Sequence, residues 1–116
     1  MSTQKQLPKA VQDDISKLQN LEDRIRTLGQ QKFTIDATIQ EKKKAIEELS
    51  ELEDTAVVYK QVGGILIHSD KAKVLVELND EISTLEMRRK TIERSESSNT
   101  QSYEELRKKL TQQLQS

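Results

Sequence analysis

Two long stretches of this chain carry apolar residues at alternating spacings of three and four. This spacing is typical of a helix that buries one narrow stripe against another helix. The two series are mirror images, because the numbers of paired positions always add up to 124. The chain should therefore form two antiparallel helices whose seam residues share layers. The first series is Leu49, Ile46, Lys42, Ile39, Ile35, Lys32, Leu28, Ile25 and Leu21; the second is Leu75, Leu78, Ile82, Leu85, Arg89, Ile92, Glu96, Asn99 and Tyr103.

The pattern predicts a mainly α fold, a long antiparallel two-helix coiled coil. We expect a polar N-terminal tail over residues 1–7, a first helix over 8–53, and a second helix with a C-terminal tail over 70–116. Pro8 suits the first turn of a helix, where a missing N–H does no harm. Acid-before-base pairs four residues apart support both helices. These pairs are Asp13–Lys17, Glu22–Arg26, Glu86–Lys90, Glu104–Lys108 and Glu105–Lys109.

Two places are weak for a helix. Gly29 lies inside the first helix, where glycine costs about 1 kcal/mol relative to alanine. The polar segment 95–102 in the second helix is rich in serine and asparagine. The pairing rule places Leu28 beside Glu96, so both weak places fall at one level. We expect a continuous but compliant joint there.

The sixteen residues between the helices, 54–69, change period and predict a β-hairpin. Residues 55–62 are rich in β-branched and aromatic types. Gly63 and Gly64 supply the positive φ values of a two-residue turn, and residues 65–67 form an apolar second strand. Ser69 or Asp70 then caps the second helix.

This hairpin is too apolar to stand alone, because a two-stranded hairpin is marginal in water and has two unpaired edges. We expect hairpins from several chains to pair edge to edge and close an intersubunit β-barrel. The alternative is that one face packs on the helix ends and the other is tolerated in water. The expected oligomerisation residues are Val57, Val58, Tyr59, Val62, Gly63, Gly64, Ile65, Leu66 and Ile67.

At the far end of the two helices the register is expected to change. Leu21, Leu18 and Ile15 are spaced three and three, whereas Tyr103, Leu106 and Leu110 are spaced three and four. Helix ends fray, so apolar side chains there can become available to another chain. The alternative, equally open from spacing, is that they only close the coiled coil. The residues concerned are Val11, Ile15, Leu18, Leu106, Leu110 and Leu114.

Composition narrows the class of protein further. Apolar residues make up 33% and charged residues 34%, with only 3% aromatic, which suits exposed helices with a narrow seam. The net charge of −1 is spread evenly, so we expect neither a nucleic-acid nor a membrane partner. No cysteine is present, and no stretch suits a signal peptide or a membrane span. We therefore expect a soluble, cytoplasmic protein.

Residues that could carry catalysis are few. His68 is the only histidine, and a lone histidine is more often a surface or strand residue than a ligand. Gly63-Gly64 lacks the spacing of a phosphate-binding loop. The basic residues in the seam, Lys32, Lys42 and Arg89, more often fix register than perform chemistry. We expect no enzyme, and no catalytic, metal or cofactor site.

The hairpin segment resembles a known family. The run Val58-Tyr-Lys-Gln-Val-Gly-Gly-Ile-Leu-Ile67, between two long helices, resembles the β-class subunits of prefoldin. The later run Leu85-Glu-Met-Arg-Arg-Lys-Thr-Ile-Glu-Arg94 is similar to the second helix of the archaeal type. The α class carries two hairpins in a longer connector, whereas residues 54–69 leave room for one.

The resemblance implies an ATP-independent cytosolic chaperone without a cofactor. Its partners would be prefoldin α subunits, in a hetero-hexamer of two α and four β subunits joined by a double β-barrel of hairpins. The coiled-coil tips would hold unfolded polypeptides and transfer them to a group II chaperonin. The serine-rich segment 95–102 departs from the archaeal pattern. The alternative function is a coiled-coil scaffold or tether that its hairpin merely oligomerises.

Overall fold

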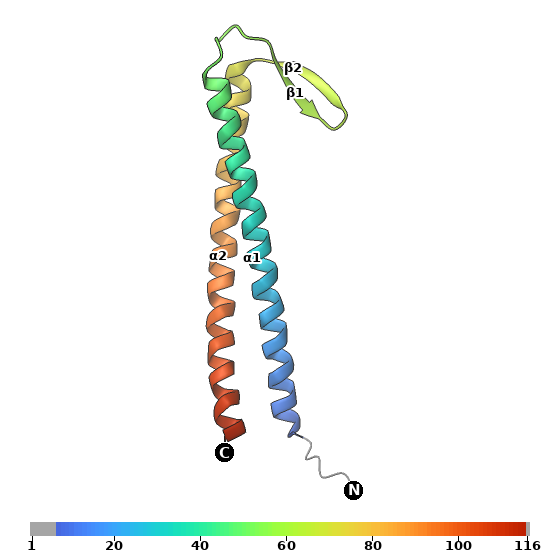
Figure 1. The fold of residues 1–116 in the computed structure, drawn as a ribbon, viewed down its shortest axis with the longest axis vertical. Coiled ribbons are helices and arrows are strands. Elements are labelled where there is room, and N and C mark those ends of the chain that lie inside the picture. Colours follow the sequence, from blue (N-terminus) through green and yellow to red (C-terminus); the bar gives the residue numbers. More distant parts are fainter. Residues whose placement is uncertain (1–6, 116) are drawn as a thin grey trace. The chain divides into compact units, whose positions relative to one another are not determined.

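The computed structural model describes residues 7–115 and contains two long helices joined by one β-hairpin (Figure 1). Helix α1 spans Lys9–Ser50, strand β1 Val58–Val62, strand β2 Ile65–Ser69 and helix α2 Lys71–Gln115. This confirms the predicted mainly α fold with one hairpin between the helices. Most of the expected N-terminal tail, residues 1–6, lies outside the described residues, as does Ser116.

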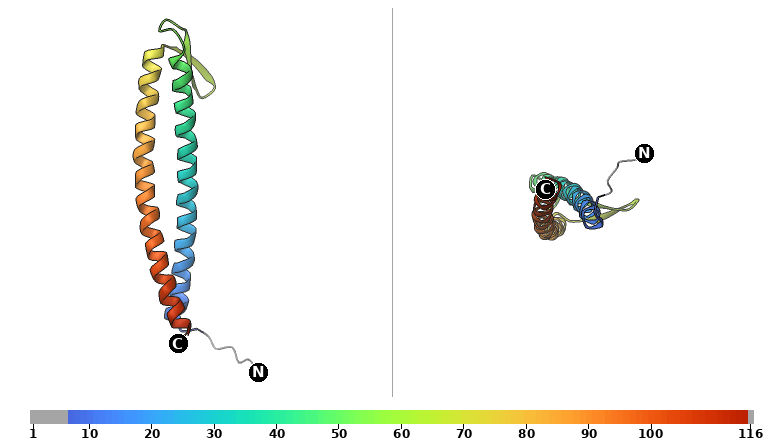
Figure 2. Two further views of the ribbon diagram at one scale, coloured as in Figure 1. Left: turned by 60° about the vertical axis from the view of Figure 1, so that its left-hand side comes forward. Right: turned by 90° about the horizontal axis from the view of Figure 1, so that it is seen from below.

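The chain divides into two units. The terminal unit is Met1–Lys32 with Ile92–Ser116, and the hairpin unit is Phe33–Thr91. Within each unit, a segment of α1 and a segment of α2 lie side by side and run in opposite directions (Figure 2). Each layer expected from the mirrored spacing has both members in the same unit.

The predicted seam is the buried stripe of both units. Every seam position from Leu21 to Leu49 and from Leu75 to Tyr103 is buried or half-buried. Its most buried residues are isoleucines, with exposed fractions of 5–8%. These are Ile35, Ile39 and Ile82 in the hairpin unit and Ile92 in the terminal unit. Burial of these branched side chains is the main source of helix pairing, because isolated helices gain little stability from propensity alone.

The basic seam residues keep their charges at the seam edge, each next to an acid of the other helix. Lys42 Nζ lies 2.6 Å from Glu81 Oε2, and Arg89 Nε lies 2.8 Å from Asp36 Oδ1. Lys32 Nζ lies 3.7 Å from a Glu93 oxygen. Their side chains are 26–43% exposed, as expected for long basic side chains that keep the charged group near water.

At the helix ends next to the hairpin, backbone N–H and C=O groups have specific hydrogen-bond partners. Asp70 is the cap of α2, because its Oδ1 accepts a hydrogen bond from Lys73 N at 2.8 Å. Helix α1 ends at Ser50, three residues before the predicted end at residue 53. The last turn is tighter than an α-helical turn, because Leu52 N donates a hydrogen bond to the Leu49 carbonyl three residues back. Lys71 Nζ then donates to Leu52 O at 2.8 Å.

The hairpin has a two-residue turn, as Val62 pairs with Ile65 in the antiparallel register. Gly63 has a φ of 60°, but Gly64 does not have a positive φ. The prediction that both glycines would adopt positive φ is therefore wrong for Gly64. These φ signs are those of a type II′ turn, which needs a left-handed residue only at its first central position.

Helix α2 is unbroken through the polar segment 95–102. Within this segment, the side-chain Nδ2 of Asn99 donates to Ser95 O at 2.6 Å, one turn earlier. The predicted continuity is confirmed. The expected compliance at this level stays a prediction.

Candidate interaction sites

The β-hairpin of the hairpin unit presents two different faces. Side chains alternate along a strand, and cross-strand partners share a face. The register therefore places Val58, Lys60 and Ile67 on one face, and Tyr59, Leu66 and His68 on the other. Val58 is only 8% exposed, so the Val58 end of the first face lies against the helices of the same chain, whereas Val62, Ile65 and Ile67 farther along that face are exposed. Val58 lines a groove of about 460 Å³ together with residues of both helices, of β1 and of the turn after α1: Ala45, Glu48, Leu49, Leu52, Tyr59, Lys60, Val74 and Leu78.

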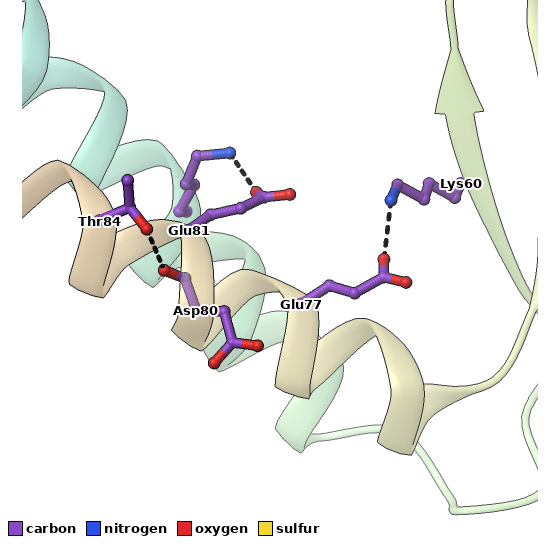
Figure 3. Close-up of polar contacts among 6 residues, drawn as sticks. Lys60, Glu77, Asp80, Glu81 and Thr84 are labelled. Carbon is purple, nitrogen blue, oxygen red and sulfur yellow. Dashed lines mark hydrogen bonds and ion pairs between the residues drawn. The ribbon is translucent and has the colours of Figure 1, made fainter.

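An ion pair joins the hairpin to α2. Lys60 Nζ on β1 lies 2.8 Å from Glu77 Oε2, one turn and a half into α2 (Figure 3). The hydrogen bond from Lys60 holds the pKa of Glu77 below its ordinary value of 4.5. The same hydrogen bond raises the pKa of Lys60 above 10.5, and the charge of Glu77 adds to this shift. Val58 and Lys60, two residues apart, thus fix the face that the hairpin turns toward its own helices.

The rest of the hairpin leaves a large apolar surface in water. Six of the predicted oligomerisation residues have exposed fractions of 49–66%: Val57, Tyr59, Val62, Ile65, Leu66 and Ile67. The Tyr59 and His68 rings stack edge to face, with centroids 5.7 Å apart. Within the described residues the sheet has two strands, so each strand has one edge without a strand partner. Such an edge bordered by apolar side chains is suited to pairing with another chain.

The predicted residues thus divide into two groups. Val58 packs inside its own chain, and Gly63 and Gly64 form the turn. The remaining six side chains project from the hairpin and are free to contact a neighbour. The packing of the hairpin on its own helices is thus limited to the Val58 end of one face, and most of the apolar surface stays exposed. The pairing of hairpins from several chains stays a prediction.

The second predicted site lies in the terminal unit, in the segments 7–18 and 104–115, which we call the tip segments. Val11 and Leu110 are buried, with exposed fractions of 8% and 4%. Only Leu114, at 58%, projects fully into water, and Leu7 beside the predicted set is 42% exposed. The other predicted residues, Ile15, Leu18 and Leu106, are half-buried. In this structure the tip segments are therefore closed, with an apolar rim.

The sequence analysis missed one buried residue of the tip segments. Asp14 is 8% exposed, and its Oδ2 lies 3.1 Å from Lys109 Nζ of α2. The signal was present, because steps of three and four from Leu21 lead to Leu18, Asp14 and Val11. The predicted register change rested on Ile15 in place of Asp14, and the burial of Asp14 contradicts it. Asp14 is more buried than Ile15, so the seam keeps its alternating spacing to Val11.

Metal-binding clusters and membrane-spanning helices are absent from the described part of the chain. Within residues 7–115 no group of three or more histidine, cysteine, aspartate or glutamate side chains could hold a metal ion. Neither helix is long and apolar enough, over its described residues, to cross a bilayer. His68 is engaged with the Tyr59 ring. The features with a clear chemical use are the hairpin surface and the tip segments.

Two paired helices with an apolar hairpin between them define a class of protein, the two-helix coiled coil with a β-hairpin connector. Residues 12–116 match the prefoldin subunit family. The chain belongs to the prefoldin family, which is a family of molecular chaperones and not a known enzyme family. Membership also means that the chain is a subunit of a multi-subunit complex.

Proteins similar to this chain are prefoldin beta subunits, and one of known structure has the same fold. The chain is 40% identical over 108 residues to the prefoldin subunit beta of Saccharolobus islandicus strains, which covers 93% of this chain and 86% of the relative. It is 37% identical over 109 residues to that of Pyrococcus furiosus, covering 94% and 90%. The crystal structure of the prefoldin beta subunit from Thermococcus strain KS-1 superimposes with a TM-score of 0.85 at 32% identity. That match covers 97% of this chain and 99% of the other.

Proposed function

We propose that this chain is a β-type prefoldin subunit that captures unfolded polypeptides without ATP and passes them to a group II chaperonin in the cytoplasm. In this proposal it joins α subunits in a hetero-hexamer of two α and four β chains. The observation that carries the proposal is the contiguous group of six exposed apolar side chains on the hairpin; the apolar set of the tip segments, of which Leu114 is exposed, supports it.

The hairpin supports the assembly part of the proposal. Its six exposed apolar side chains and its two open strand edges would be an aggregation hazard in a monomer. Pairing with neighbouring hairpins satisfies the edge N–H and C=O groups and removes the apolar side chains from water. The resulting ring of hairpins is the intersubunit β-barrel expected from the sequence.

The tip segments support the client-binding part. Val11, Ile15, Leu18, Leu106, Leu110 and Leu114 form an apolar set at the free ends of both helices. Helix ends open more readily than helix centres, so this set can alternate between closed and accessible states. An unfolded chain offers scattered apolar side chains, which need apolar partners but no fixed sequence.

Capture without nucleotide follows from several weak contacts acting together. Each subunit of an assembly offers one set of tip segments, and a client held by one set meets the others at a high effective concentration. Release needs only that the individual contacts dissociate one after another. A receiving chaperonin then competes for the same apolar segments of the client.

Truncation tests this function. Removing residues 1–18 and 104–116 should abolish suppression of aggregation of an unrelated denatured protein, measured by light scattering. The oligomer should persist, because the seam from Leu21 to Tyr103 and the hairpin are untouched. Full activity of the truncated complex would refute the tip assignment. If the intact complex also fails to suppress aggregation, the chain is a tether and not a chaperone.

A further inference from the structure

The tip segments contain a charged group where the rest of the seam is mainly apolar. Asp14 occupies a seam position between Val11 and Leu18 and is as buried as Val11, at 8% exposed. The mirrored spacing puts it opposite Leu110, which is 4% exposed. An aspartate at this place costs desolvation free energy that a leucine would not.

The carboxylate of Asp14 has one ion-pair partner at the edge of the seam. Lys109 Nζ, on the other helix and 57% exposed in its side chain, lies 3.1 Å from Asp14 Oδ2. The pair therefore bridges the two helices at the level of the buried Leu110, one layer away from the buried Val11. Replacing such a pair by apolar residues often stabilises a protein, whereas removing one partner destabilises it.

We propose that Asp14 and Lys109 form a latch that sets how readily the tip segments open to a client. The closed state satisfies the carboxylate with the lysine, and the open state satisfies both groups with water. The difference in free energy between the two states is thus smaller than for an all-apolar seam. The tip segments stay closed at rest and yet open often enough for Val11, Ile15 and Leu110 to meet an unfolded chain.

The latch rests on the proposed function, since it governs access to the client-binding residues. If only the open state binds, the apparent Kd equals the intrinsic Kd divided by the open fraction. A change in the latch should therefore move the opening of the tip segments and the affinity for client by similar factors. Asp14 sets how often the client-binding residues are exposed, and it does not itself contact the client.

The test uses two variants of the full chain in its assembled complex, with matched controls on neighbouring exposed residues. Asp14→Leu should slow hydrogen exchange of the tip amides about tenfold, because leucine completes the apolar seam. Lys109→Met should accelerate it about tenfold, because the carboxylate loses its partner. Asp13→Leu and Lys108→Met change the same residue types at positions exposed to water and should alter exchange far less.

Client capture is measured in the same four variants with fluorescently labelled, reduced and carboxymethylated α-lactalbumin, which stays unfolded. Asp14→Leu should weaken binding about tenfold, and Lys109→Met should strengthen it, following the open fraction. An exposed leucine at position 13 cannot by itself weaken capture. If Asp13→Leu weakens client binding as much as Asp14→Leu does, the loss of a negative charge is the cause, and the latch is overturned.

Two further outcomes separate the latch from the proposed function. Unchanged hydrogen exchange in both Asp14→Leu and Lys109→Met overturns the latch whatever the binding data show. Capture that is abolished by truncation of the tip segments but insensitive to both latch variants also overturns it, while leaving the client site in place. Capture that survives truncation refutes the client site itself.

Discussion

At the scale of single residues, the seam accommodates cations because each one has an acid within reach on the other helix. Lys42 meets Glu81, and Arg89 meets Asp36. Their side chains remain 26% and 43% exposed, so the charges stay partly hydrated and their desolvation cost is small. What these pairs contribute is mainly a preference for one register, since an ion pair forms only where the partners are level.

Replacing Gly29 by alanine should stabilise the protein. A Cβ at this position would lie 3.6 Å from Glu96 Oε2, an ordinary contact distance, so the methyl group fits. Alanine is favoured over glycine inside a helix by about 1 kcal/mol. Urea unfolding at one fixed protein concentration measures the change. Gly63→Ala is the contrasting control and should destabilise, because Gly63 has a φ of 60°. A destabilised Gly29→Ala variant would contradict the expectation.

Residue partners were harder to predict from the sequence than residue positions. The spacing identified the buried stripe, but members of three predicted ion pairs have other partners in the structure. Arg26 lies 3.3 Å from Asp23, Glu104 lies 3.0 Å from Arg107, and Lys109 pairs with Asp14 across the helices. Exposed long side chains choose among acids of nearly equal energy. The spacing within one helix also carries no information about charges on the other.

At the scale of elements, the hairpin was predictable where local chemistry decides it. Gly63-Gly64 between two β-branched segments predicted the turn, and Asp70 was a predicted cap of α2. The orientation of the hairpin against α2 could not be predicted. It depends on Val58 and Lys60 reaching groups of helices distant in sequence, and no local propensity encodes that contact.

The docking of the hairpin on α2 should depend on pH. The pKa of Glu77 is lowered from 4.5, so its contribution is complete above pH 4.5 and is lost as the pH falls through the lowered value. The pKa of Lys60 is raised from 10.5, so its contribution is complete below pH 10.5 and is lost as the pH rises through the raised value. Docking should therefore be strongest between these limits. The NMR signals of the Val58 methyl groups report whether this side chain is packed on the helices.

Glu77→Gln is the matched control for this pH dependence. The variant keeps a polar group of the same size but removes the charge that Lys60 pairs with. Its Val58 signals should lose the acid transition that Glu77 causes, while transitions of other carboxylates remain. An identical acid transition in both proteins would show that Glu77 does not hold the hairpin.

At the scale of the whole molecule, apolar exposure in the described residues is unevenly distributed. The hairpin carries six exposed apolar side chains, whereas the helices between hairpin and tip segments carry isolated ones such as Phe33, Val76 and Met87. Isolated exposed apolar residues are normal on a protein surface, but a contiguous group indicates an interface. Membership of the prefoldin family agrees with this reading, since its members are subunits of complexes.

Leu66→Lys should weaken assembly by at least about tenfold, because a lysine would have to be buried between hairpins. Val76→Lys introduces the same residue at a similarly exposed position of α2, 61% against 66%, and should assemble normally. Light scattering coupled to size-exclusion chromatography measures the mass of each variant, alone and mixed with an α-type subunit. Equal masses for both variants would exclude the hairpin as the assembly surface.

The mirrored seam also determines what happens when the two helices meet out of step. A slip of one heptad keeps most apolar side chains in contact, so apolar spacing alone barely resists it. In one direction of slip, however, Lys42 would lie at the level of Arg89. Glu81 would then no longer be level with Lys42, nor Asp36 with Arg89. Two cations would then share a layer in place of two ion pairs. The slipped pair of helices is therefore less stable than the aligned pair, so the ion pairs favour one alignment of α1 and α2.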